Sequence, residues 1–268
     1  MSANISTTLT NLANEYYISA TSAEGQKIDL SVAHIKERLA NHFGQRLIRV
    51  IEFGSYRRDT ILPRRYDNYS DVDLMVIFNT AGGTLSPNTY RTYLANFATQ
   101  SYPRSEFYRT LPTVTLELDH IHYDLVPAYQ NYVWWKAGLP ALYIPESGTT
   151  WQETDPIAFN TRLTEANTRH GSQIKRVIRL FKAWNAKVGY PFESFKLEEE
   201  IVSMGFGGCT TLQQYFLFVI DYLSLFNRSA NLLAALRALQ NNGARLRNAL
   251  DFGTIEQAKT WLAHILPM

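Results

Sequence analysis

The stretch Ser70-Asp71-Val72-Asp73-Leu74-Met75-Val76-Ile77-Phe78 is where the interpretation of this chain begins. Its apolar second half is typical of a buried strand. Side chains at positions i and i+2 of a strand project to the same face, so Asp71 and Asp73 lie side by side. Neighbouring carboxylates repel each other unless a cation lies between them, and hard oxygen ligands suit Mg²⁺, with Mn²⁺ as the alternative. Solvated acids at a strand end are the other interpretation; we favour the metal, because burying two like charges without a cation is costly.

A second predicted strand, Leu47–Phe53, comes earlier in the chain and ends directly at Gly54-Ser55. Glycine lets the backbone turn sharply and lets a phosphate approach closely. Backbone N–H groups together with a serine hydroxyl can hold phosphate oxygens. Taken alone, a Gly-Ser pair is equally typical of an ordinary turn, so its meaning depends on the acids that follow.

Two β-rich runs predict a hairpin: Thr113–Leu118 and Ile121–Val126, joined at Asp119-His120 and closed by Pro127. Asp124 lies inside the second run, where an acid needs a partner. If this strand lies beside the strand of Asp71, three carboxylates converge. Asp119 is the rival third acid, but it lies at the predicted turn, where Asp is common for other reasons. Three carboxylates near a phosphate-holding Gly-Ser are the parts of a two-metal phosphoryl-transfer site.

The fold class that these patterns predict is α+β, with a change of character along the chain. Residues 1–150 are expected to form the core with N-terminal helices, and residues 151–268 a helical lobe. Residues 129–156 show no clear periodicity and form a soft boundary. Further helices are predicted at 194–204, 211–226, 229–241 and 254–266, with Gly243 between the last two.

Composition narrows the classes of protein that fit this chain of 268 residues. Lys and Arg number 26 against 24 Asp and Glu, which argues against a protein that coats a long nucleic acid. The single cysteine, Cys209, rules out an internal disulfide framework and suits a reducing cytoplasm. The most apolar stretch, Tyr215–Phe226, is interrupted by Asp221 and is too short to span a bilayer, so we expect a cytoplasmic protein without a membrane partner.

Basic residues recur on one predicted helix, where Lys175, Arg179 and Lys182 lie at i, i+4 and i+7. Facing a cleft, this stripe could hold a triphosphate, and Lys182 is the favoured ligand. A solvated basic face is the alternative. As a phosphate ligand, Lys182 is expected to contribute to nucleotide affinity and not to stability. The acids of residues 198–200 are expected to form a solvated helix start.

Gly54-Ser55 followed by Ser70–Leu74 resembles the signature of the polymerase β-type nucleotidyltransferase superfamily. More narrowly, the chain is similar to the bacterial CD-NTases, cGAS/DncV-like enzymes of CBASS anti-phage systems. Tyr123–Ala128 and Phe181–Asn185 carry this narrower resemblance, which extends over roughly residues 30–226. It implies a nucleotidyltransferase mixed β-sheet core with flanking helices, followed by an α-helical lobe, with the active site in the cleft between them.

The resemblance also implies roles for individual residues. The catalytic residues, which hold two Mg²⁺ ions, are Asp71, Asp73 and Asp124. The nucleotide-binding residues are Gly54, Ser55, Lys182, Ser194 and Phe195. Within this second set, Ser55 and Lys182 contact phosphates, whereas Phe195 stacks on a base.

The implied activity joins nucleoside triphosphates, ATP with itself or with another, into a cyclic di- or oligonucleotide second messenger. A separate effector protein responds to the product. Ring closure follows from the resemblance alone, because the residues themselves indicate only nucleotidyl transfer. Two alternatives remain: transfer to an RNA end or a protein hydroxyl, and a catalytically silent nucleotide-sensing module. The near-balanced charge weighs against a long RNA, and the presence of all three acids weighs against a silent module.

Overall fold

The computed structural model describes residues 4–109, 111–118, 121–132 and 140–268. These residues pack as two compact units, and neither unit is one continuous stretch of sequence. The sheet unit is formed by the described parts of 18–59 and 69–158. The helical unit is formed by 159–268 together with the N-terminal segment up to residue 17 and the loop 60–68.

The sheet unit is built on one mixed sheet, in which the described residues form seven strands. The strands are β1 (Leu47–Phe53), β2 (Asp71–Phe78), β3 (Phe107–Tyr108), β4 (Val114–Leu118), β5 (Ile121–Tyr132), β6 (Pro140–Pro145) and β7 (Trp151–Thr154). Their order is β1-β2-β5-β4-β3, and β6 pairs with both β5 and β7. The β2–β5 pair is parallel, and the other described pairs are antiparallel.

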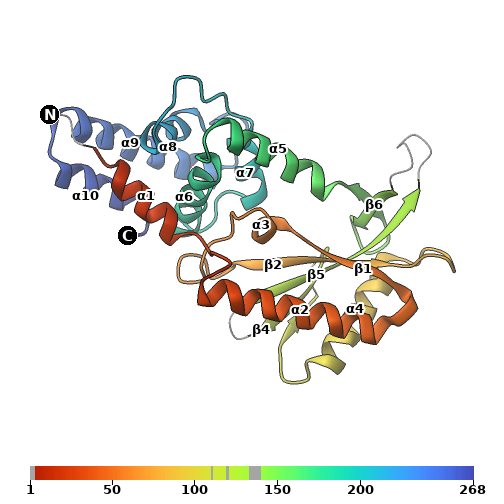
Figure 1. Ribbon diagram of the computed structural model, residues 1–268. Helices are drawn as coiled ribbons and strands as arrows, with labels where there is room; N and C mark the ends of the chain where they lie inside the picture. Colours follow the sequence, from red (N-terminus) through yellow and green to blue (C-terminus); the bar gives the residue numbers. More distant parts are fainter. Residues whose placement is uncertain (1–3, 110, 119–120, 133–139) are drawn as a thin grey trace. The chain divides into compact units, whose positions relative to one another are not determined.

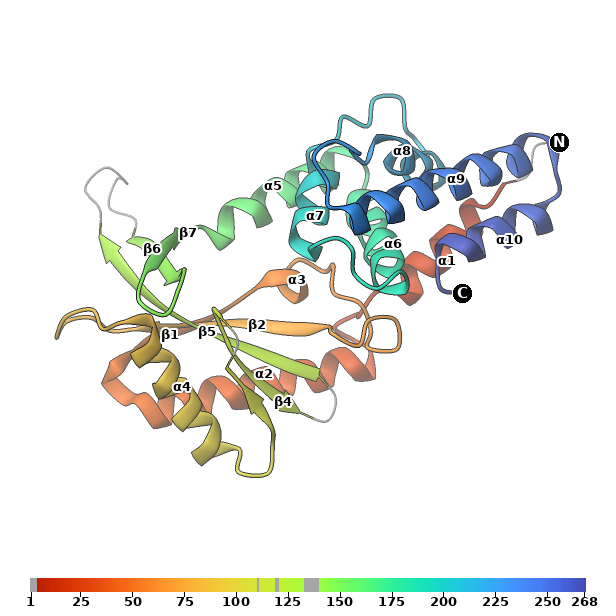
Figure 2. The same ribbon diagram turned by 180° about the vertical axis from the view of Figure 1, so that it is seen from behind.

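Two helices, α2 (Ala23–Phe43) and α4 (Pro87–Ser101), cover one face of this sheet, as Figures 1 and 2 show. Each begins at a serine whose side chain accepts a hydrogen bond from a backbone N–H of the first turn, which satisfies one orphan donor. Phe78 joins the two helices to the sheet, with its ring 5.1 Å from Phe43 and 4.7 Å from Tyr90. A 3₁₀ turn, Gly44–Arg46, connects α2 to β1.

The opposite face of β2 carries the acids. Because side chains alternate along a strand, Asp71 and Asp73 share their face with Met75 and Ile77. These two apolar residues are buried in a small cluster with Ala128 and Leu142 from β5 and β6. The short helix α3 (Gly54–Arg57) follows β1 on the same side of the sheet (Figure 1). The acids therefore lie at one end of a packed face, next to a sharp turn.

Strand β5 is longer than the sequence predicts, because it continues through Pro127 instead of ending there. Pro127 lies opposite Val76 of β2, between Leu125, the last residue paired with β4, and Tyr129, the first paired with β6. A proline without an N–H donor is tolerated where one side of the strand has no partner. The segment 129–156, which lacks a readable period, adds the rest of β5 and strands β6 and β7.

The helical unit contains the remaining helices of the described chain. They are α1 (Ser6–Glu15), α5 (Pro156–Arg169), α6 (Ile174–Lys187), α7 (Ser194–Val202), α8 (Leu212–Tyr222), α9 (Ala230–Phe252) and α10 (Ile255–Ile265). The first turn of α5 belongs to the sheet unit. Trp184, Phe181 and Phe216 are among the largest fully buried side chains of the core. Helix α9 does not end near Gly243 as predicted; a Cβ there would meet Ile220 of α8 at 2.5 Å, so glycine permits close helix packing.

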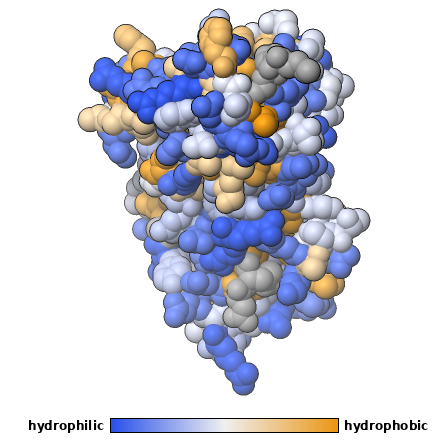
Figure 3. All heavy atoms as spheres, turned by 90° about the vertical axis from the view of Figure 1, so that its left-hand side faces the viewer, coloured by the Kyte–Doolittle hydropathy of each residue, from blue (hydrophilic) through white to orange (hydrophobic). Residues whose placement is uncertain are grey.

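Among the described residues, no helix combines the length and apolar character needed to cross a membrane. On the face seen in Figure 3, hydrophilic residues surround scattered apolar ones.

Candidate active site

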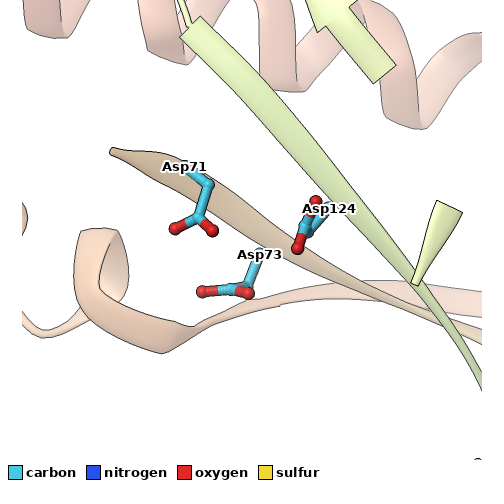
Figure 4. Close-up of side chains that lie close together, drawn as sticks. All are labelled: Asp71, Asp73 and Asp124. Carbon is cyan, nitrogen blue, oxygen red and sulfur yellow. The ribbon is translucent and has the colours of Figure 1, made fainter. Parts of the chain in front are cut away.

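Strand register brings the three predicted acids together. In the parallel β2–β5 pair, Asp73 lies opposite Asp124 and Asp71 lies opposite His122. Residues opposite each other in register project to the same face, so all three carboxylates share one surface of the sheet. One oxygen from each of Asp71, Asp73 and Asp124 lies within 4.8 Å of the others. Figure 4 shows the three side chains turned toward a common point.

The donor set fits a hard divalent cation. Each of the three acids offers a carboxylate oxygen, and each is partly buried, neither enclosed in the core nor fully solvated. Carboxylates at this spacing repel one another, and Mg²⁺ or Mn²⁺ turns that repulsion into attraction. The arrangement is therefore one that a divalent cation would stabilise, with Asp71, Asp73 and Asp124 as its ligands.

Asp124 has the most defined surroundings of the three acids. Burial raises the pKa of its carboxyl, while hydrogen bonds from Thr115 and Thr113 and the neighbouring His122 act to lower it. The Thr115 hydroxyl donates to Asp124 Oδ1 at 2.5 Å. His122 in turn lies 3.2 Å from Glu117, measured from Nε2 to Oε1. Burial is the largest of these effects, so the net pKa of Asp124 is above its ordinary value.

Position 54 must be glycine because the Asp73 carboxylate packs directly against it. Its φ is +69°, a left-handed conformation that glycine adopts without strain. A Cβ built on Gly54 would lie 1.6 Å from Asp73 Oδ2. Ser55, the second residue of α3, is partly buried directly after this turn. The Gly-Ser pair therefore lies at the carboxylate cluster, and glycine is needed there because Asp73 occupies the space of a side chain.

In the helical unit, Lys182 is 6% exposed and lies 3.5 Å from Glu198, measured from Nζ to Oε1. Glu198, only 1% exposed, also accepts a hydrogen bond from the Thr60 hydroxyl at 2.9 Å. The expectation of a solvated acid at position 198 is therefore wrong. Arg179 is also buried: its Nε donates to the Ala13 carbonyl at 3.1 Å. A solvated basic stripe is thus wrong for Lys182 and Arg179.

The other predicted nucleotide-binding residues begin α7. Ser194 is partly buried, and Phe195 is 40% exposed with its ring 4.9 Å from that of Phe159 in an edge-to-face contact. Their proposed contacts with a base stay a prediction. Asp119, the rival third acid, lies outside the described residues.

Sequence reasoning missed Thr115, although the signal was present. A hairpin whose turn is Asp119-His120 pairs residues that sum to 239, which places Thr115 opposite Asp124; the structure has that register. Glu198 was also missed, and no comparable signal exists for it, because its partner Lys182 is 16 residues away on another helix.

A mixed sheet bearing three convergent carboxylates beside a Gly-Ser turn defines a nucleotidyltransferase fold. Residues 3–167 match the SMODS family, the Second Messenger Oligonucleotide or Dinucleotide Synthetase domain. This match covers more than half of the chain, which therefore belongs to that family and is a CD-NTase. The family resemblance and the fold class expected from the sequence are confirmed.

Two relatives illustrate the similarity in sequence. The chain is 27% identical over 188 residues to a protein of Bacillus cereus (strain VD146) named a probable cyclic nucleotide synthase, covering 57% of this chain and 54% of the relative. It is 22% identical to the CBASS oligonucleotide cyclase CdnC of Escherichia coli (strain KTE188), covering 64% of this chain and 55% of the relative. The matches thus span about half the length of these relatives.

Similarity in structure extends further along the chain. The structure of CdnC from E. coli MS115-1 with ATP superposes with a TM-score of 0.73 at 16% identity, covering 97% of this chain and 96% of that one. At this identity the likeness shows the fold, and the shared fold includes both the sheet and the helices described above.

Proposed function

We propose that this protein is a Mg²⁺-dependent nucleotidyltransferase that joins nucleoside triphosphates into a cyclic di- or oligonucleotide. The observation that carries the proposal is the cluster of Asp71, Asp73 and Asp124, whose oxygens lie within 4.8 Å of one another. Three convergent carboxylates are the donor set of enzymes that transfer a nucleotidyl group. Membership in a family of second-messenger synthetases supports the cyclic product.

The residues of the sheet unit have separable tasks in this proposal. Asp71, Asp73 and Asp124 would hold the divalent cations, which lower the pKa of an attacking ribose hydroxyl and neutralise the charge of the departing pyrophosphate. Ser55 offers a hydroxyl and a backbone N–H to the triphosphate. Gly54 leaves room for the Asp73 carboxylate and so keeps this ligand in the cluster.

We extend the proposal to Lys182, Ser194 and Phe195, with Lys182 binding phosphate and Phe195 stacking on a base. Lys182 is already paired with Glu198, so a phosphate contact would require the ammonium group to share or exchange that partner. Leaving a buried ion-pair partner costs free energy, and this cost applies to Lys182 but not to Ser194 or Phe195.

The biological role that we propose is synthesis of a signal in anti-phage defence, read by a separate effector protein in the cytoplasm. The E. coli relative named a CBASS oligonucleotide cyclase supports this role. The substrates that we propose are nucleoside triphosphates, ATP among them, in line with the ATP named for the CdnC structure.

The test is product formation from radiolabelled nucleoside triphosphates with Mg²⁺ and no added acceptor. We expect a small labelled product that resists phosphatase, because a ring has no terminal phosphate. The variant Asp71→Asn/Asp73→Asn is the matched control and should form none. Labelling that requires added RNA or protein would instead favour transfer to an acceptor. Nucleotide binding without turnover, tested with Mg²⁺ and with Mn²⁺, would favour a silent sensing module.

A further inference from the structure

One row of residues runs across the acid-bearing face of the sheet from β2 through β5 to β4. Asp73 pairs with Asp124, and Asp124 pairs with Thr115 on its other side. Asp124 is therefore flanked by a second carboxylate and by a hydroxyl, all projecting to the same face. The Thr115 hydroxyl donates to Asp124 Oδ1 at 2.5 Å, the distance of a strong O–H···O⁻ hydrogen bond.

The direction of this hydrogen bond follows from the groups involved, because a hydroxyl carries a proton and an ionised carboxylate carries none. A threonine hydroxyl has one proton, and that of Thr115 is given to Asp124. The hydroxyls of Thr113 and Thr115 lie 3.4 Å apart, and Thr113 also hydrogen-bonds the Asp124 carboxyl. Thr113 is buried, whereas Thr115 is partly exposed. Both hydroxyls therefore hydrogen-bond the same carboxyl group.

We propose that Thr115 is a positioning residue, which holds the Asp124 carboxylate in the orientation that binds the divalent cation. The Thr115 hydroxyl occupies one direction around Oδ1 on the β4 side, whereas Asp73 lies on the β2 side of Asp124. This inference rests on the proposed metal-dependent function and adds a residue to which nothing in the comparisons gives a role.

A purely structural role makes a different prediction. Threonine is favoured in strands because its branched side chain packs well there, and valine satisfies that preference equally. If Thr115 served only the strand, Thr115→Val would leave metal binding unchanged. If its hydroxyl orients Asp124, valine loses that function and Thr115→Ser keeps it. Removing a residue that hydrogen-bonds a metal ligand lowers the affinity for the metal by about ten- to a hundredfold.

The experiment measures Mn²⁺ binding by electron paramagnetic resonance of free Mn²⁺, using the full chain without nucleotide. We compare wild type, Thr115→Val and Thr115→Ser, with Thr154→Val as a control for removing a hydroxyl from a strand, β7, that pairs with β6 and with neither β2 nor β5. Thermal melts of the metal-free variants check that each is folded. The same comparison between Thr115→Val and Thr115→Ser is made in an Asp124→Asn background.

We expect Thr115→Val to bind Mn²⁺ about tenfold more weakly, and Thr115→Ser and Thr154→Val to bind as wild type does. With Asp124→Asn present, Thr115→Val should cause no further loss. Unchanged binding by Thr115→Val, or equal loss in Thr115→Ser, overturns the inference and leaves the proposed function intact. A wild type that does not bind Mn²⁺, or an Asp124→Asn variant that binds equally well, overturns the metal site itself and the inference with it.

Discussion

The sheet unit gathers like charges at one place, whereas the helical unit pairs opposite charges inside its core. Asp71, Asp73 and Asp124 are partly exposed and bring their oxygens within 4.8 Å of one another. Lys182 and Glu198 are almost fully buried, 3.5 Å apart. A bound cation stabilises a cluster of like charges, whereas two opposite charges buried together stabilise each other. We infer that the first arrangement serves binding, whereas the second can be disturbed only by leaving a charge in the core with less compensation.

The largest effect should come from Asp71→Asn combined with Asp73→Asn. We expect turnover to fall roughly a thousandfold or more, because the cation ligands of β2 are lost. The melting temperature of the metal-free protein should stay the same or rise, since two mutually repelling charges disappear. Product assays and thermal melts are compared with Glu146→Gln, an exposed acid of the same unit. Product formation at the wild-type rate would falsify the assignment of the site.

The third acid is tested by Asp124→Asn against Asp119→Asn. Asp124 lies opposite Asp73 in the sheet, so Asp124→Asn should lower turnover by about two orders of magnitude or more. Asp119→Asn is expected to keep most activity and to change the free energy of unfolding by about half a kcal/mol at most. Initial rates at saturating Mg²⁺ give the comparison. Loss of activity in the Asp119 variant alone would reverse the assignment.

A methyl group at the glycine turn tests how tightly the cluster is packed. Gly54→Ala places a Cβ against Asp73 Oδ2 and must displace that carboxylate. We expect roughly a hundredfold lower turnover, the cost of a small misplacement of a reacting group. Gly83→Ala is the matched control, because it also has positive φ but meets nothing within 4 Å. The result that contradicts this argument is equal activity in the two variants.

The opposite-charge pair is tested by Lys182→Met, Glu198→Gln and the double variant. Each single change removes one member of a buried ion pair, so each should lower the free energy of unfolding by about 3 kcal/mol, and the double variant by less than their sum. This replaces the sequence-based expectation that Lys182 contributes little to stability. Urea denaturation followed by circular dichroism measures it, and additive losses would show that the two groups do not interact.

Isothermal titration with a nucleoside triphosphate then tests the second task proposed for Lys182. Loss of a phosphate contact should weaken binding by roughly ten- to a hundredfold in Lys182→Met. Glu198→Gln keeps the ammonium group and should bind at least as well as wild type. Equal affinity of all three proteins would limit Lys182 to its structural role.

The smallest effect concerns the pH dependence of stability. Burial raises the pKa of Asp124 in the folded protein, so the folded state binds this proton more tightly than the unfolded chain does. The metal-free protein should therefore lose stability as the pH rises from the ordinary Asp pKa through the raised value. Asp124→Asn removes this loss, so its melting curve against pH should be flatter over that window. Parallel curves for the two proteins would show that Asp124 is not perturbed.

Much of the site could be predicted because its residues are neighbours along strands. The spacing of Asp71 and Asp73 fixes their common face, and the hairpin predicted from the sequence has the register in which Thr115 of β4 meets Asp124. The ends of strands and helices were predicted less well where packing between distant segments determines them. Pro127 continues a strand because it lies between the residues paired with β4 and those paired with β6. Gly243 lies inside α9, where its missing Cβ lets Ile220 pack closely.

The sequence by itself determined the acid-bearing strand, the glycine turn before it and the family to which the chain belongs, because each depends on residues within a few positions of one another. Only the tertiary structure decided that Asp73 occupies the space beside Gly54 and that Glu198 is buried against Lys182. Burial and charge compensation are properties of surroundings that the whole chain supplies. Local spacing fixes where a side chain points, but the fold fixes what it meets there.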